Sequence, residues 1–267
     1  MADATISPAP TGTDDFEIGA TINQVFTAFS KAPLQLILIA AVPALLSFPA
    51  NLHQISALFA VFQYRGDPQA MALAMQSGGG AGFIPGLLSF VGSILSIISL
   101  AALIFGSSQL MLGEQAQLGG WMRFGLSRFW PIIGVSFLVM LGAGVGFVLL
   151  IVPGIILALM WSAAFPICVI EKLGPIKSLG RSAFLTKGHR WSLLGLFILF
   201  VVVAWVVYAV LLGVLFAIRS PIAMAIGLLV VTVLGTLVGC LLQASVYQNL
   251  RLAKEGVRTG QVAAVFD

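Results

Sequence analysis

One stretch decides the fold: residues 192–218 read SLLGLFILFVVVAWVVYAVLLGVLFAI, without a single charged side chain. An α-helix needs about 20 mostly apolar residues to cross the hydrocarbon core of a bilayer, and this stretch is longer. It is also far longer than the strands of a membrane β-barrel and lacks their alternation of polar and apolar residues. The stretch therefore predicts a transmembrane helix.

Similar apolar segments occur on both sides of this stretch. They predict an all-α integral membrane protein with about six transmembrane helices. Pro153-Gly154 predicts a tight turn between the third and fourth segments, and the fourth is short for a full crossing. In chain order the predicted spans are 33–52, 83–112, 130–151, 155–170, 192–218 and 221–246.

The overall composition agrees with a membrane protein. Of the 267 residues, 60% are hydrophobic and 8% are charged, whereas about a quarter of a soluble domain is charged. The net charge of +4 predicts basic loops that face an anionic leaflet, and it gives no reason to expect nucleic acid as a partner. Both cysteines, Cys168 and Cys240, lie in apolar segments, so no disulfide framework is expected.

The distribution of Lys and Arg predicts the orientation, because cytoplasmic loops carry the excess of both residues. With both termini in the cytoplasm, only Arg65 and Arg219 of the 13 basic residues fall outside. Omitting the short fourth span would move the basic 172–190 segment to the other side. The cytoplasmic residues are then Lys31, Arg123, Arg128, Lys172, Lys177, Arg181, Lys187, Arg190, Arg251, Lys254 and Arg258.

Three short segments predict amphipathic helices on the membrane surface. The first covers residues 14–30, with Asp14 or Asp15 as its N-cap; the alternative is a helix that binds a soluble partner. The second begins at Pro175 and stops at Gly188, and a weaker one covers 118–128. In the first helix, the predicted apolar stripe is Ile18, Ile22, Val25, Phe26 and Phe29, and the opposite face is Asn23, Gln24, Thr27 and Ser30.

Each surface helix precedes two predicted spans, which suggests a threefold repeat of helical hairpins. The units are 14–112, 113–171 and 172–250, within one membrane domain over 14–250. Residues 1–13 are expected to be a disordered leader and not a cleavable signal peptide, because no basic region precedes a short apolar core. Residues 251–267 are expected to form a cytoplasmic tail, and 53–82 an external loop.

The segment from Glu171 to Trp191 is the richest in polar and basic side chains. One interpretation is a surface that binds a lipid headgroup or a phosphate. The other is a topology determinant with an interfacial ion pair at Glu171 and an anchor at Trp191. The candidate headgroup or phosphate ligands are Lys177, Arg181, Ser182, Lys187 and Arg190.

A few polar residues fall near the inner ends of spans. Gln109, Gln243 and Tyr247 either form hydrogen bonds between helices or line a polar cavity open to the cytoplasm. No charged residue lies near the middle of any span, which argues against a transporter that relies on a buried carboxylate relay.

Catalytic groups are scarce. The only histidines, His53 and His189, fall on opposite sides of the membrane in the predicted topology. No set of metal ligands at suitable spacing and no phosphate-binding glycine loop is present. We therefore expect a non-catalytic protein without a metal or cofactor.

Part of the sequence resembles the glycerophosphodiester phosphodiesterase membrane-domain family. The similarity is clearest over residues 113–256, and it implies the membrane part of that family without the soluble catalytic domain found in some members. No catalytic residue follows from it. The residues that carry it are Ile151–Gly154, Glu171, Ser178–Ser182, Leu185–Gly188, Trp191, Tyr247–Arg251 and Glu255-Gly256.

These observations predict a bacterial inner-membrane protein that binds or organises membrane lipids, including anionic lipids, or a membrane-protein partner. The alternatives are a transporter or channel for a small or lipidic substrate, and an accessory protein or enzyme of phospholipid metabolism. A homo-oligomer is a further expectation, since Gly142, Gly144 and Gly146 permit close contact between helices.

Overall fold

The computed structural model describes residues 18–63, 66–67, 69–70, 72–73, 82–149, 151–218 and 220–256. The predicted leader 1–13, the Asp14 or Asp15 cap, the end of the predicted tail and much of the predicted external loop lie outside these residues.

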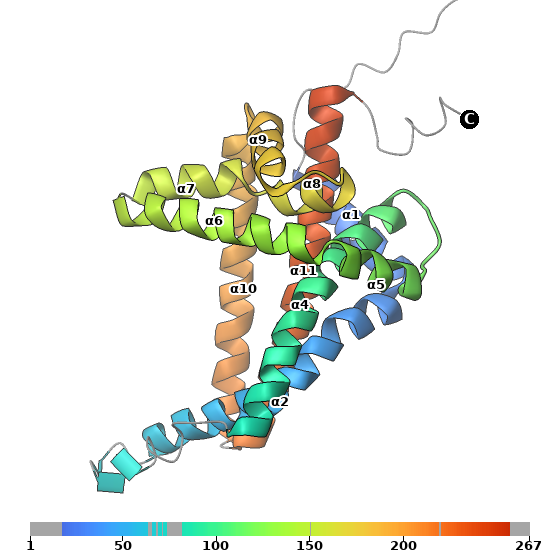
Figure 1. Cartoon of the computed structure of the whole chain (residues 1–267). Helices are drawn as coiled ribbons and strands as arrows, with labels where there is room; N and C mark the ends of the chain where they lie inside the picture. Colours follow the sequence, from blue (N-terminus) through green and yellow to red (C-terminus); the bar gives the residue numbers. More distant parts are fainter. Residues whose placement is uncertain are drawn as a thin grey trace, which may run out of the picture.

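The all-α membrane fold is confirmed. The described residues contain no β-strand, and six of their segments are long and apolar enough to cross a membrane. Figure 1 shows the helices in chain order, which are α1 (Ile18–Lys31), α2 (Pro33–Gln63), α4 (Phe83–Met111), α5 (Leu118–Ser127), α6 (Phe129–Leu149), α7 (Ile151–Met160), α8 (Ala164–Ile170), α9 (Pro175–Thr186), α10 (Arg190–Ile218) and α11 (Pro221–Glu255).

The packed centre of the molecule consists of α2, α4 and α11. Small residues on α4 let its neighbours approach closely, as is usual between membrane helices. At Gly92, for example, a Cβ atom would lie 3.0 Å from the Pro43 carbonyl oxygen of α2. The largest buried side chains of these three helices include Leu36, Leu103, Ile104, Leu237 and Tyr247.

Two helices extend beyond their predicted spans. α2 continues to Gln63 through a segment predicted as the start of the external loop, because residues 55–62 are themselves apolar. α11 continues to Glu255 and ends where Gly256 adopts a φ of +68°, so residues 251–255 are helix and not tail. With 35 residues, α11 is roughly 52 Å long, and it rises past the other spans in Figure 1.

The fourth predicted span is broken into two helices. α7 ends at Met160, a turn occupies residues 161–163, and α8 begins at Ala164. The predicted tight turn at Pro153-Gly154 is wrong, since both residues lie in the first turn of α7. A proline is tolerated there because the N–H that it lacks has no partner in the first turn of a helix.

The three predicted surface helices are present as α1, α5 and α9. Pro175 occupies the first turn of α9, and Gly188 follows the helix with a φ of +98°, as predicted. With α8, these helices lie toward the end of the molecule at which α11 finishes (Figure 1). We call this the inner end, because the charge bias predicts that it faces the cytoplasm.

The helices α6 and α7 form a tight antiparallel pair. A Cβ atom at Gly146 would lie 3.0 Å from the Gly154 Cα, and one at Gly142 would overlap the Trp161 ring, whereas Gly144 has open space. Two of the three glycines proposed for an interface between copies therefore serve packing within the chain. In Figure 1 this pair runs across the direction of α10 and α11.

Gly125 offers a test of how α5 is seated on α4. A Cβ at Gly125 would lie 2.5 Å from the Ile98 backbone oxygen, while one at Gly119 on the same helix meets nothing within 4 Å. We expect Gly125→Ala to lower the free energy of unfolding by about 1–3 kcal/mol through overpacking. Gly119→Ala should not lower it. The measurement is unfolding in detergent micelles by denaturant titration, and equal stabilities of the two variants would contradict this packing.

Candidate functional site

Helix α1 lies across the inner ends of three long helices. At one end, Ile18 packs over Gly195 of α10, with its Cδ1 4.0 Å from where a Cβ of Gly195 would be. At the other end, Lys31 Nζ donates to the Leu110 carbonyl of α4 at 2.8 Å. A cation at a helix C-terminus satisfies a carbonyl that has no partner within the helix. The helix thus bridges α10 and α4.

Between these ends, α1 is fixed to α11 by polar side chains. Ser245 Oγ donates to the Gln24 Oε1 at 2.7 Å, and Gln24 Nε2 donates to Asn249 Oδ1 at 3.0 Å. Asn249 Nδ2 donates to Thr21 Oγ1 at 2.8 Å. Gln24, predicted on the face opposite the apolar stripe, is turned toward α11 by these interhelical hydrogen bonds.

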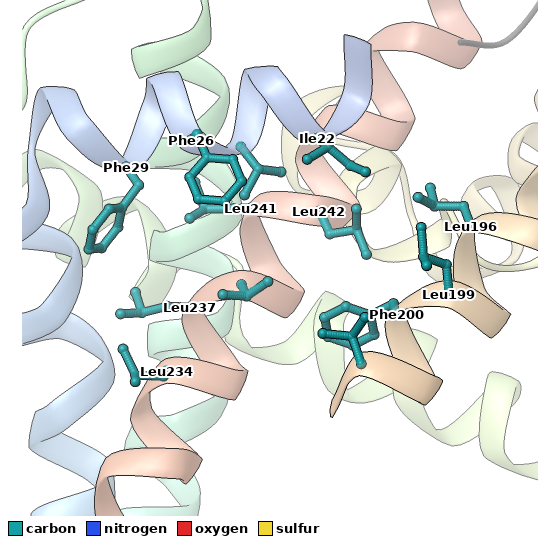
Figure 2. Close-up of a pocket in the computed structure, with 13 residues that line it drawn as sticks. Ile22, Phe26, Phe29, Leu196, Leu199, Phe200, Leu234, Leu237, Leu241 and Leu242 are labelled. Atoms are coloured by element: carbon teal, nitrogen blue, oxygen red, sulfur yellow. The ribbon is translucent and has the colours of Figure 1, made fainter. Parts of the chain in front are cut away.

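The apolar stripe predicted for α1 is divided between two environments. Val25 is buried against the core, while 69% of the Phe26 side chain is exposed. Ile22 and Phe26 face an apolar groove beneath α1, between α10 and α11 (Figure 2). One edge of the apolar stripe therefore packs against the core, and the edge with Phe26 remains exposed.

This groove has a volume of about 360 Å³, within the range of small-molecule sites. Every residue that lines it is apolar. They are Ile22, Val25, Phe26 and Phe29 of α1, Leu196, Leu199, Phe200 and Val203 of α10, and Leu234, Leu237, Val238, Leu241 and Leu242 of α11.

The groove is covered at its inner end and open along its side. α1 covers its inner end (Figure 2). Farther toward the outer end, beyond the groove lining, Leu212 of α10 and Phe48 of α2 both pack against Met224 and Ala225 of α11. Between these contacts the described side chains of α10 after Leu196 are not buried. The two helices therefore touch near their ends and separate between them.

The depth of the groove follows from the helix rise. Leu196 and Val203 lie 6 and 13 residues after Arg190, the first residue of α10, which is roughly 9–20 Å along the helix. A bilayer core is about 30 Å thick. Measured from Arg190, the groove begins in the half of such a core nearest the inner end and extends slightly past its middle.

A network of ion pairs and hydrogen bonds joins α9 to the last turns of α11. Arg181 Nε lies 3.1 Å from Glu171 Oε2, and its Nη2 pairs with Glu255. Arg251 Nε lies 3.0 Å from Glu255 Oε2. Tyr247, which is buried, donates to Glu171 Oε1 at 3.0 Å. These five residues form the inner network.

The electrostatics of the inner network centre on Arg181. Burial alone would lower the pKa of its guanidinium, but hydrogen bonds to Glu171 and Glu255 outweigh burial and raise that pKa. The arginine is therefore charged throughout the physiological range, and both carboxylates already share it. Its positive charge is largely neutralised by protein groups and is less available to an external anion.

A second set of hydrogen bonds holds the break between α7 and α8. Ser182 Oγ donates to the Met160 carbonyl at 2.7 Å and accepts from the Ala163 N–H at 3.2 Å. Thr186 Oγ1 approaches the same Met160 oxygen at 3.4 Å. Non-helical backbone at membrane depth is stable only when protein groups pair its polar atoms. Ser182 and Thr186 of α9 provide those partners.

The candidate headgroup ligands are thus divided by the structure. Lys177 and Lys187 are exposed, as a headgroup surface requires. Ser182 is fully buried, so its assignment as a headgroup ligand is wrong, because its hydroxyl is used at the helix break. Arg181 belongs to the inner network, and the Arg190 Nε is buried without a hydrogen-bond partner among the described residues.

The other candidates are placed as follows. Trp191 is 84% exposed at the start of α10, where an interfacial anchor is expected, and Glu171 forms the ion pair predicted for it. Gln109 accepts from Trp121 Nε1 at 2.6 Å, and Tyr247 bonds Glu171, so both serve contacts between helices. The Gln243 Oε1 is buried without a hydrogen-bond partner among the described residues.

Sequence reasoning missed the groove and the full inner network. The groove was missed because its residues are ordinary span residues, and only the separation of α10 from α11 makes them line a space. A signal for the network was present in Arg251 and Glu255, four residues apart on one helix. The described residues contain no group of three or more His, Cys, Asp or Glu that could hold a metal ion.

Comparison with known proteins finds no matching family model, no similar curated protein and no similar solved structure.

The inner network can be measured by a double-mutant cycle on Arg181→Gln and Glu255→Gln. Each single change should lower the free energy of unfolding by about 1.5–3 kcal/mol, because it removes one of the two charged hydrogen bonds that Arg181 or Glu255 makes in the network. The combined loss should be smaller than the sum by about 0.5 kcal/mol or more. Lys177→Gln, on the exposed side of α9, is the control and should change stability by less than about 0.5 kcal/mol. Strictly additive losses would show that Arg181 and Glu255 do not interact.

Ser182→Ala tests the partner role at the helix break. We expect a loss of about 1–3 kcal/mol, because the buried Ala163 N–H loses its partner and the Met160 carbonyl keeps only the longer contact from Thr186. Ser178→Ala, on the same helix, should cost less, because the Ser178 hydroxyl bonds back to the Gly174 carbonyl of its own turn. Thermal unfolding in detergent measures both, and a Ser178→Ala loss as large as that of Ser182→Ala would refute this role.

Proposed function

We propose that this protein binds membrane lipid, and that one acyl chain lies in the groove between α10 and α11 beneath α1. The observation that carries this proposal is a groove lined only by apolar side chains. A polar solute would lose its hydrogen bonds to water there without gaining others. An acyl chain loses nothing, because it exchanges one apolar environment for another.

The shape of the groove supports a lipid over a soluble ligand. Its side is open where the described side chains of α10 remain exposed, and it begins in the half of the bilayer nearest the inner end. A lipid of that leaflet reaches it by lateral movement without passing through water. Contact with fixed side chains then holds the chain more firmly than neighbouring lipids would.

The headgroup of such a lipid would lie at the inner surface, close to the three surface helices. Exposed Lys177 and Lys187 favour an anionic headgroup, since each basic residue near an anionic surface contributes about 1 kcal/mol. The proposed setting is the cytoplasmic leaflet of a bacterial inner membrane. The protein acts there as a non-catalytic binder or organiser of lipid.

The resemblance to the glycerophosphodiester phosphodiesterase membrane domain supports the same proposal. The residues that carry it include Glu171, Arg181, Ser182, Thr186 and Tyr247, all of which join helices in this structure. A motif made of such residues describes a way of packing a membrane domain. It supports the proposal that this membrane domain acts without catalysing a reaction.

The test uses phosphatidylglycerol with a photoreactive group midway along one acyl chain, in vesicles that contain the full chain. Mass spectrometry of cross-linked peptides should show preferential labelling of Phe26 and Leu241 over Val206, on the exposed face of α10. Leu199→Trp, which fills the groove, should reduce groove labelling about tenfold, the effect of losing contact with roughly two methylene groups.

The matched control is Val202→Trp, on the same helix but outside the groove lining, with 53% of its side chain exposed. It should leave groove labelling unchanged. Equal labelling of Phe26 and Val206, or equal effects of the two tryptophans, would mean that the groove holds no preferred lipid. Repeating the experiment with phosphatidylethanolamine tests the preference for an anionic headgroup separately.

A further inference from the structure

The pair α6–α7 is oriented differently from the other long helices. In Figure 1 it runs across α10 and α11 at the level of α8 and α9. Two helices whose directions cross in projection are not parallel in space. If α10 and α11 cross the bilayer, α6 and α7 do not follow the same direction.

The length of α7 agrees with this orientation. It has 10 residues, which span roughly 15 Å, about half of a 30 Å hydrocarbon core. The turn at 161–163 separates it from α8. By itself, a helix as short as α7 does not bring the chain back across the whole hydrocarbon core.

The start of α6 and the end of α7, which lie together at the open end of the hairpin, are both held at the inner end of the molecule. The Met160 carbonyl at the end of α7 accepts hydrogen bonds from Ser182 and Thr186 of α9. Near the start of α6, a Cβ at Gly134 would lie 2.6 Å from Pro175 Cγ of α9. α9 itself exposes Lys177, a residue that belongs at the membrane surface. The contacts of α9 therefore fix the open end of the hairpin at that level.

The surface of the pair requires a lipid environment. Residues 129–170 include no Asp, Glu, Lys, Arg or His. A large exposed apolar patch does not persist in water. Large exposed side chains occur along both helices, namely Trp130, Phe137, Met140, Leu141 and Val145 of α6 and Val152 and Ile156 of α7.

From these observations we infer that the α6–α7 hairpin lies within the inner leaflet, parallel to the membrane plane, with acyl chains as its partner. The distribution of Lys and Arg is compatible with this arrangement. It requires only that Arg128 and Lys172 lie on the same side, and a hairpin that returns without crossing meets that requirement. Length and composition qualify six segments as spans but do not fix the direction in which each one lies.

The experiment compares membrane depths along α6 and α10. Single cysteines replace Phe137 and Val145 of α6 or Ile198 and Val206 of α10, all exposed, in the full chain carrying Cys168→Ala and Cys240→Ala. Each carries a nitroxide label in phosphatidylglycerol–phosphatidylethanolamine vesicles. Depth is read from the relative accessibility of the label to oxygen and to a water-soluble nickel complex.

Both pairs of positions are eight residues apart, or roughly 12 Å along a helix. The α10 pair should differ in depth by close to that distance and serves as the control. The α6 pair should differ by less than half as much, at a depth within the inner leaflet. A depth difference on α6 of half the α10 value or more would overturn the inference. This experiment does not depend on whether the groove binds lipid.

Discussion

Backbone polar groups in the hydrocarbon core have no water to bind, and this constraint governs the rest of the structure. Long uninterrupted helices satisfy it over most of the chain. The break at residues 161–163 would violate it, but Ser182 of α9 pairs with both the Met160 carbonyl and the Ala163 N–H, and the Thr186 hydroxyl also approaches the Met160 oxygen. Because α9 has to stay in place to do this, the inner network that fixes Arg181 to α11 also protects the break.

Polar residues in this protein therefore work mainly between helices at the inner end. Gln24, Ser245 and Asn249 fix α1 across α11, and Glu171 and Glu255 hold α9. Through these contacts, α1 and α9 are both attached to α11 at the centre of the molecule. The long middle of α10 lacks such contacts, and the apolar groove opens beside it. The polar side chains are concentrated at the inner end, where they attach helices to one another. Farther along α10 such side chains, among the described residues, make no contacts with α11, and the two helices separate there.

The sequence was sufficient to predict the helical class, the apolar segments and the three surface helices, because hydropathy and helix-end signals such as Pro175 and Gly188 are local. It did not predict the break in the fourth segment, since Trp161, Ser162 and Ala163 are compatible with a continuous helix and the partner Ser182 lies about 20 residues away. The sequence placed several cations near Glu171, so its pairing with Arg181 was one of several possible ion pairs. The groove depends on how far α10 stands from α11, and no local pattern encodes that distance.

The attachment of α10 at both ends has a mechanical consequence. Ile18 and Leu196 hold the inner end of α10, and Leu212 holds its outer end. The helix therefore does not rotate outward about one fixed end. The space beside it widens only if α10 bows, and bending a helix is stiffer than rotating it about a free end. The thickness of an occupant is therefore restricted more strictly than its length. Slender molecules fit such an opening without any change in the path of α10, whereas thick ones require the helix to bow.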